Sequence, residues 1–159
     1  MRKKNVLVTG IGQANYILQL YSKISPLLDN FNFNSLNLKQ FGDQEVKEAA
    51  TTIFTDNFYT SFNFKNVFQL IKGILVVFSN GYFWKDLRIL FAEKGWKIFH
   101  TSFNLLLRHI DSYSYARFID KSTDTEIIHL HVPRHRYTLF LKYLKKEYEL
   151  IISYWGSDI

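Results

Sequence analysis

Three histidines near the end of the chain are the residues whose type and spacing most readily suggest chemistry. His129 and His131 lie two residues apart in the apolar run 126–132, and His135 follows Pro133. Residues two apart in a strand face the same side, so we expect the first two imidazoles to share one face of a sheet. Imidazole titrates near neutral pH, so such a pair can exchange protons, bind a metal or hydrogen-bond to a hydroxyl or phosphate.

The surroundings of these histidines favour a polar ligand over a metal. The chain contains no cysteine, and no carboxylate joins the histidines at a ligand spacing, so we expect no metal. His129, in mid-strand, is expected to lie deeper, as a core histidine. His131 precedes Pro133 at the carboxyl end of its strand, where open α/β sheets bind ligands, and Arg134 follows on the loop. A solvated loop is the alternative interpretation of this segment.

A second candidate site is the turn Gly10-Ile11-Gly12, which follows the apolar run 5–9. Glycines allow a tight turn and a close approach to a ligand, and the helix expected to follow offers free N–H groups to an anion. The dinucleotide fingerprint requires a third glycine, where this chain has Asn15, and an acidic residue after the second strand. No Asp or Glu occurs in the run 31–38, so a nicotinamide cofactor is disfavoured. Another ligand, or simply a turn that needs small residues, remains open.

The third candidate is Gly156-Ser157-Asp158, which follows the last apolar run. It too would fall at the carboxyl end of a strand. Ser or Asp there could cap a following helix, or the carboxylate could bind a sugar hydroxyl.

The elements that must position these residues alternate between strand and helix. Strands are expected at 5–9, 31–38, 126–132 and 149–154, the last one buried. A helix follows the glycine turn and ends before Pro26, and helices are also expected at 66–79, 83–94, 97–110 and 137–146. Residues 45–64 give a mixed signal, since 45–50 favour a helix and 51–55 a strand. The pattern predicts a single α/β domain over residues 1–159, with a Rossmann-like parallel sheet and flanking helices.

Charge and aromatic content point to an anionic partner for the middle of the chain. The net charge is +6, and nine basic residues against four acidic ones fall within 65–121, among many Phe, Tyr and Trp residues. Basic and aromatic residues at helical spacing suit an anionic membrane surface, although a core with a solvated face explains them equally. Nucleic acid is disfavoured because no motif for it is present. With no signal peptide and no apolar span, we expect a cytoplasmic protein, either free or peripheral on the inner face of the membrane.

Two segments resemble a known family of enzymes. The segments NVLVTGIGQAN (5–15) and EIIHLHVPRHRYTLFLKYLKKEYELIISYWGSD (126–158) are similar to the N-terminal domain of bacterial GT-B glycosyltransferases of family 4. In that family the first strand ends in a glycine loop, an I-I-H-x-H strand follows later, and a further strand ends in H-G-S-D. This chain departs from the last motif, because Trp155 stands where the family often has histidine.

The resemblance implies an acceptor-binding domain in polysaccharide or lipopolysaccharide synthesis. It places Gly10, Gly12, Gln13 and Asn15 in a cleft, His131 in a catalytic position on the acceptor side, and Arg134, Gly156, Ser157 and Asp158 near the reacting groups. A nucleotide-sugar is then the donor, a glycan or lipid-linked glycan the acceptor, and neither metal nor bound cofactor is required. The donor site would belong to a C-terminal domain beyond Ile159, without which this chain is expected to be inactive. The alternatives are part of a nucleotide-cofactor oxidoreductase and a non-enzymatic α/β interaction domain.

Overall fold

The computed structural model describes residues 2–10, 15–37, 44–59, 67–94, 99–131 and 138–153. The contacts within the chain divide it into two units. The first, here called the sheet unit, comprises Met1–Ser61, Ser122–Tyr137 and Lys146–Ile159. The second, the helical unit, comprises Phe62–Lys121 and Thr138–Lys145. The chain therefore passes from one unit to the other four times.

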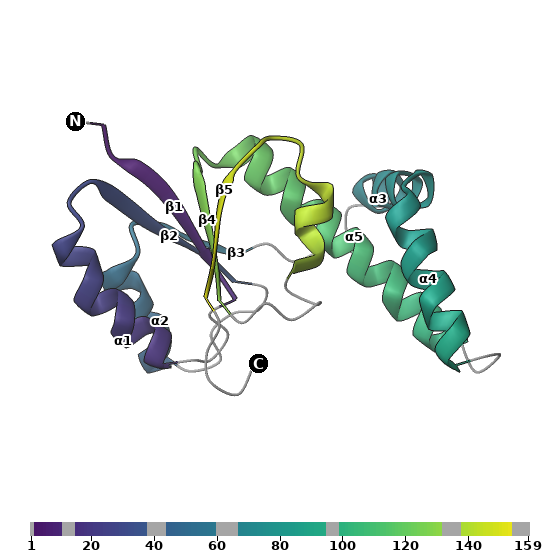
Figure 1. The fold of residues 1–159 in the computed structure, drawn as a ribbon, viewed down its shortest axis with the longest axis horizontal. Helices are drawn as coiled ribbons and strands as arrows, with labels where there is room; N and C mark the ends of the chain where they lie inside the picture. The colour runs from purple at the N-terminus through teal and green to yellow at the C-terminus, as the bar shows by residue number, and fades with distance from the viewer. Residues whose placement is uncertain are drawn as a thin grey trace. The chain divides into compact units, whose positions relative to one another are not determined.

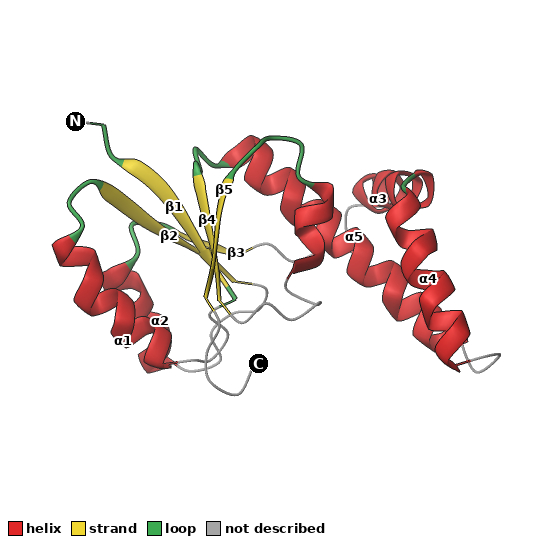
Figure 2. Cartoon of the chain, in the orientation of Figure 1, coloured by secondary structure: helices red, strands yellow, loops and turns green. Residues whose placement is uncertain are grey.

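The sheet unit is built on five parallel strands, which confirms the expected Rossmann-like α/β fold (Figure 2). They are ordered β3-β2-β1-β4-β5 and have the bounds β1 Lys4–Thr9, β2 Phe31–Asn37, β3 Asn57–Tyr59, β4 Ile127–His131 and β5 Glu149–Ser153. The chain builds outward from β1 to β2 and β3, then returns to the other side of β1 with β4 and β5. The direction of winding reverses between β1 and β4, which makes this pair the topological switch point of the sheet.

Two helices pack side by side on one face of this sheet (Figure 1). They are α1, Asn15–Ile24, and α2, Gln44–Ile53. Ile17, Leu18 and Tyr21 of α1 form a buried cluster with alternate residues of the strands, including Val6, Val8, Phe33 and Ile127. Val6 and Val8 are two residues apart on β1, so they point to the same face of the sheet. There they contact the residues that helical spacing places on one side of α1. The face of β4 that carries Ile127 therefore points toward α1.

The ends of α1 and β2 follow the expectations from sequence. The helix ends at Ile24 and gives way to the short 3₁₀ turn Ser25–Leu27, because the ring of Pro26 cannot continue an α-helix. The alternating run that follows forms β2 in parallel register with β1. In the segment with the mixed signal, the helix Gln44–Ile53 extends into the part that favoured a strand, and the strand forms later, at Asn57–Tyr59.

The helical unit contains α3 (Val67–Ser79), α4 (Gly81–Lys94) and α5 (Phe99–Ser122). The first two match the expected helices, but α5 continues twelve residues past the expected end at position 110. Buried residues recur there at helical spacing, and the pattern was missed because two of them, Ser112 and Ala116, are small. Gly73 lets α3 approach α5 closely, because a Cβ at this position would lie 3.0 Å from Cγ2 of Ile110.

Two further expectations need correction. Within the expected helix 137–146, the structure forms the 3₁₀ segment η2, Leu139–Tyr143, whose buried residues Leu139, Phe140 and Tyr143 suit either kind of helix. The last strand was expected to be buried, but β5 lies at the end of the strand order, and its residues Leu150, Ile151 and Ile152 are exposed. In the part of the chain that the structure describes, no helix is both long and apolar enough to cross a membrane.

Candidate functional site

The candidate site lies at the carboxyl ends of β1 and β4, the two strands at the switch point. Gly10 follows β1 with a φ of +82°, a left-handed conformation that a residue with a side chain rarely adopts. Its backbone is pressed against β4, since a Cβ at Gly10 would lie only 2.1 Å from the carbonyl oxygen of His131. Glycine is therefore required here for two independent reasons, backbone conformation and space.

The two histidines of β4 share a face, as the sequence predicted, and they meet a tyrosine from α1. The rings of His129 and His131 have centroids 4.2 Å apart. The hydroxyl of Tyr21 lies 2.5 Å from Nδ1 of His129 and 3.1 Å from Nε2 of His131. On the other side of His129, Nε2 lies 2.8 Å from the hydroxyl oxygen of Ser153. Three elements thus supply one continuous polar cluster, which we call the Tyr-His-Ser cluster: Tyr21, His129, His131 and Ser153.

Strand register explains why Ser153 belongs to this cluster. β4 and β5 run parallel, with His131 opposite Ser153 and His129 opposite Ile151. Residues opposite each other in a sheet point to the same face, and diagonal neighbours lie within reach of long side chains. His129 therefore reaches diagonally past Ile151 to Ser153. Because β5 is an edge strand, this end of the cluster is half-buried, whereas His131 has no exposed surface.

Burial keeps both histidines neutral. Desolvation lowers the pKa of His131 to about 4, with a further contribution from the nearby charge that His129 would carry. Desolvation also lowers the pKa of His129 and raises that of the Tyr21 hydroxyl. At neutral pH the cluster therefore contains two uncharged imidazoles and a protonated phenol, all in hydrogen-bond contact. Such a group can accept, hold and redirect a proton.

The depth expected for the two histidines is reversed. His129 was expected to be the deeper residue and His131 the one facing the crevice, but His131 is fully buried and His129 half-buried. The reason is that the close approach of Gly10 and the ring of Tyr21 both cover the carboxyl end of β4. The two ring nitrogens of His129 contact two side-chain hydroxyls, those of Tyr21 and Ser153.

Two members of the cluster were not foreseen from sequence. Tyr21 was not singled out, although it lies on the same side of α1 as the core residues Ile17 and Leu18. For Ser153 the available signal was its position in the sequence. It lies two residues after Ile151 near the end of an apolar run, just as His131 lies two residues after His129. Aligning the ends of the two apolar runs would have placed Ser153 beside His131.

Most of the other expected site residues lie outside the residues that the structure describes. These are Gly12, Gln13, Arg134, His135, Gly156, Ser157 and Asp158. Asn15 is the first residue of α1. Among the described residues, no group of three or more His, Cys, Asp or Glu side chains is placed to share a metal ion.

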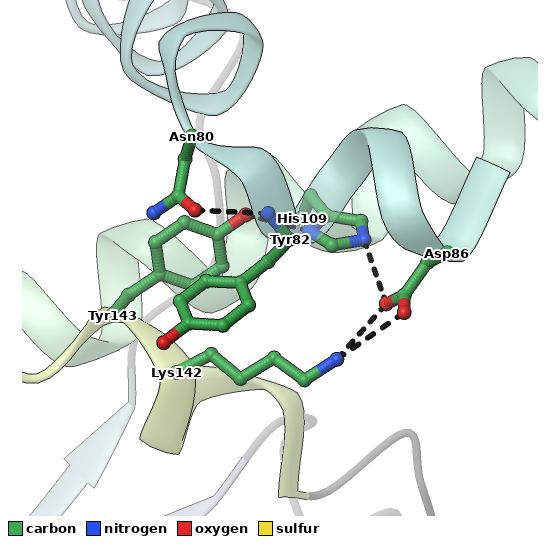
Figure 3. Close-up of polar contacts among 6 residues, drawn as sticks. All are labelled: Asn80, Tyr82, Asp86, His109, Lys142 and Tyr143. Carbon is green, nitrogen blue, oxygen red and sulfur yellow. Dashed lines mark hydrogen bonds and ion pairs between the residues drawn. The ribbon is translucent and has the colours of Figure 1, made fainter. Parts of the chain in front are cut away.

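The helical unit holds a second polar cluster, formed by the buried His109 and Tyr143 and the partly buried Asp86 and Lys142. Figure 3 shows the ring of His109 and the ammonium of Lys142 pointing toward the carboxylate of Asp86. Oδ2 of Asp86 lies 3.3 Å from Nε2 of His109 and 3.1 Å from Nζ of Lys142. On the far side of the ring, Nδ1 of His109 lies 2.5 Å from the hydroxyl of Tyr143. Burial and the Asp86 charge both raise the pKa of that hydroxyl.

This second cluster is suited to a structural role rather than to catalysis. His109 has no exposed surface and Tyr143 is buried, so a ligand cannot reach the ring or the phenol without the unit opening. The contacts join α4, α5 and η2, and Asn80 caps α4 beside them by accepting a hydrogen bond from the Tyr82 amide at 3.0 Å (Figure 3). We therefore assign the cluster to the internal framework of the helical unit.

Comparison with protein-family models, with curated proteins and with solved structures gives no match for this chain.

Proposed function

We propose that this chain is the acceptor-side domain of a glycosyltransferase that moves a sugar from a nucleotide-sugar to a growing polysaccharide or lipid-linked glycan. The observation that carries the proposal is the contact between Gly10 and His131 across the switch point of an all-parallel sheet. Ligands of open α/β sheets bind at this position, outside the carboxyl ends of the strands. The residues at this position are the same ones on which the resemblance to GT-B enzymes rests.

The chemistry of the Tyr-His-Ser cluster is consistent with this proposal. In glycosyl transfer an acceptor hydroxyl attacks the anomeric carbon and loses a proton, so the acceptor side needs a group that can take it. Neutral imidazoles with lowered pKa values are such groups, and serine and tyrosine hydroxyls bind sugar hydroxyls readily. The donor would be held mainly by a second domain, as in the enzymes that this chain resembles.

The rival readings have less support. A nicotinamide cofactor would need an acidic partner for its ribose near the end of β2, and the strand Phe31–Asn37 contains none. A non-enzymatic interaction domain gives no reason for a left-handed glycine and two neutral histidines at the switch point. We therefore retain glycosyl transfer as the proposed activity and cytoplasmic, membrane-peripheral action as its setting.

The test is sugar transfer by the protein in its natural membranes. Membranes from cells that express the protein are incubated with radiolabelled nucleotide-sugars one at a time, and label is counted in the lipid-extracted and polymeric glycan. We expect incorporation from at least one donor, and its loss when the gene is deleted. Equal incorporation with and without the gene, for every donor, would contradict the proposal.

A further inference from the structure

The Tyr-His-Ser cluster is an unbroken chain of hydrogen-bond contacts that begins at a half-buried hydroxyl and ends at a buried ring. Oγ of Ser153 contacts Nε2 of His129 at 2.8 Å. Nδ1 of the same ring contacts the hydroxyl of Tyr21 at 2.5 Å, and that hydroxyl contacts Nε2 of His131 at 3.1 Å. Both ring nitrogens of His129 are therefore occupied by hydroxyl groups, so the state of one contact determines the state of the other.

Two arrangements keep the Tyr21 proton within this chain of contacts. A neutral imidazole has one N–H donor and one acceptor nitrogen, and a hydroxyl has one proton to donate. If Tyr21 donates to His131, then Nδ1 of His129 donates to Tyr21, and Nε2 of His129 accepts the proton of Ser153. If His131 donates to Tyr21, every contact reverses and Ser153 becomes an acceptor.

Of these two arrangements, only the first gives Ser153 a base. In it the lone pair of His129 points at the serine hydroxyl, while the opposite N–H is held by the tyrosine oxygen. This is the relation found where a side-chain hydroxyl is activated, with a base in contact with the hydroxyl and a third group orienting the base. His131 is then the residue that sets the direction, because its unprotonated Nε2 receives the tyrosine proton.

We propose that Ser153 and His129 take up the proton that the acceptor hydroxyl loses, and that Tyr21 and His131 are positioning residues that direct this transfer. The inference rests on the proposed glycosyltransferase function. Ser153 is the member suited to contact the acceptor, because it is half-buried on the edge strand β5, whereas His131 is sealed. The catalytic contact that the sequence suggested for His131 thus moves to Ser153.

In the proposed step the acceptor oxygen forms a bond to the anomeric carbon, and the bond between that carbon and the diphosphate oxygen breaks, its electron pair leaving with the diphosphate. The acceptor proton passes to Oγ of Ser153 as the serine proton passes to Nε2 of His129. His129 is then an imidazolium ion whose two N–H groups bond to Ser153 and Tyr21, and it returns its proton to water when the product leaves.

The direction of the chain can be measured without a substrate. In protein labelled with ¹⁵N-histidine, the ring-nitrogen shifts at pH 7 show which nitrogen carries the proton. We expect His129 to be protonated on Nδ1 and His131 to be unprotonated on Nε2. Tyr21→Phe, which removes the directing hydroxyl, should abolish this preference in His129, and Ser22→Ala, at an exposed serine on α1, should leave it unchanged. Protonation of wild-type His129 on Nε2 would overturn the inference, whether or not Tyr21→Phe folds.

The second arm measures sugar transfer in the membrane assay. Ser153→Ala should lower kcat at least tenfold with little change in KM for the donor, while Ser22→Ala retains full activity. If wild type transfers sugar and Ser153→Ala does so equally well, this inference fails and the proposed function stands. If wild type transfers no sugar, the proposed function fails together with the role of Ser153, even where the shifts agree with the expected direction.

Discussion

The hydroxyl of Tyr143 lies 2.5 Å from Nδ1 of His109, and this contact joins η2 to the middle of α5 inside the helical unit. Both side chains are buried, so water cannot replace either partner if the other is removed. Leaving a buried polar group without its partner costs about 1–3 kcal/mol.

We expect Tyr143→Phe to lower the free energy of unfolding by about 1–2 kcal/mol, because the phenyl ring still fills the site while the His109 contact is lost. Urea denaturation checks this. Tyr82→Phe is the matched control, since it removes the same hydroxyl from an exposed ring in the same unit and should change the stability by less than about 0.5 kcal/mol. Equal stability of the two variants would show that the contact contributes nothing to the fold.

Gly10 and Gly81 allow a paired test of the switch point. Gly10→Ala adds a methyl group at a φ of +82° and against the His131 carbonyl, so it should cost about 3 kcal/mol or more. At Gly81, the start of α4, nothing lies within 4 Å of an added Cβ. Gly81→Ala should therefore be neutral or stabilise by up to about 1 kcal/mol. Thermal unfolding of both variants checks this, and a neutral Gly10→Ala would contradict the tight contact.

The lowered pKa of His131 predicts a loss of stability in mild acid. In the folded state the pKa is about 4, against about 6.5 for an unperturbed histidine, so the unfolded chain binds more protons between these values. The free energy of unfolding should therefore fall as the pH drops from about 6.5 to about 4, by at most about 3 kcal/mol, and this group should add no further loss below pH 4. The lowered pKa of His129 acts in the same direction.

Urea denaturation at several pH values measures this slope. In His131→Gln the fall between pH 6.5 and 4 should become markedly smaller, whatever the stability of the variant at pH 7. A slope unchanged by the substitution would mean that other groups cause the acid sensitivity. Because the ring of His131 is fully buried, shortening this side chain should also lower the stability at pH 7.

The helical unit is expected to bind anionic lipid surfaces. It contains eleven of the twenty basic residues and four of the fourteen acidic ones, a net charge of +7 against −1 for the sheet unit. One side of α3 exposes an apolar stripe at helical spacing, made of Phe68, Ile71, Leu75 and Phe78, and Lys72 is exposed beside it. An apolar stripe beside basic residues is typical of helices that lie in a membrane interface.

Flotation with anionic liposomes at low salt tests this expectation. Phe68→Glu removes the most exposed apolar side chain of the stripe and adds a repelled charge, so it should reduce the bound fraction at least tenfold. Leu27→Glu, at an equally exposed apolar residue of the sheet unit, is the control and should reduce binding much less. Binding that is indifferent to salt, or lost equally in both variants, would count against a membrane contact through α3.

The sequence predicted the sheet well where a single local pattern decides the structure. The apolar run of β1, the alternation of β2 and the stop at Pro26 each follow from the chemistry of neighbouring residues. The length of α5 could not be predicted in this way, because small buried residues weaken its apolar pattern. The 3₁₀ form of η2 could not be predicted either, because the spacing of Leu139, Phe140 and Tyr143 suits both an α-helix and a 3₁₀ helix.

The candidate site was predicted only in part, for a related reason. A spacing of two residues on one strand places His129 and His131 on one face, and a glycine turn after a strand marks Gly10. Tyr21 and Ser153 join them through helix packing and strand register, which bring together residues more than a hundred positions apart or on separate strands. No local periodicity contains the contact with Tyr21, and Ser153 joins only when the ends of two separate apolar runs are aligned, so the complete cluster could be recognised only in three dimensions.

The order of the strands also determines when the site can form during synthesis. Val6 of the central strand pairs with Phe33 on one side and with Ile127 on the other. As the chain leaves the ribosome, β1 can pair with β2 early. Its other edge pairs with β4, which is made only after the whole of α3, α4 and α5. Through that interval β1, the strand that Gly10 follows, presents an open, apolar edge. A chaperone that shields nascent strand edges would therefore affect the yield of this protein more than that of a chain whose neighbouring strands follow one another.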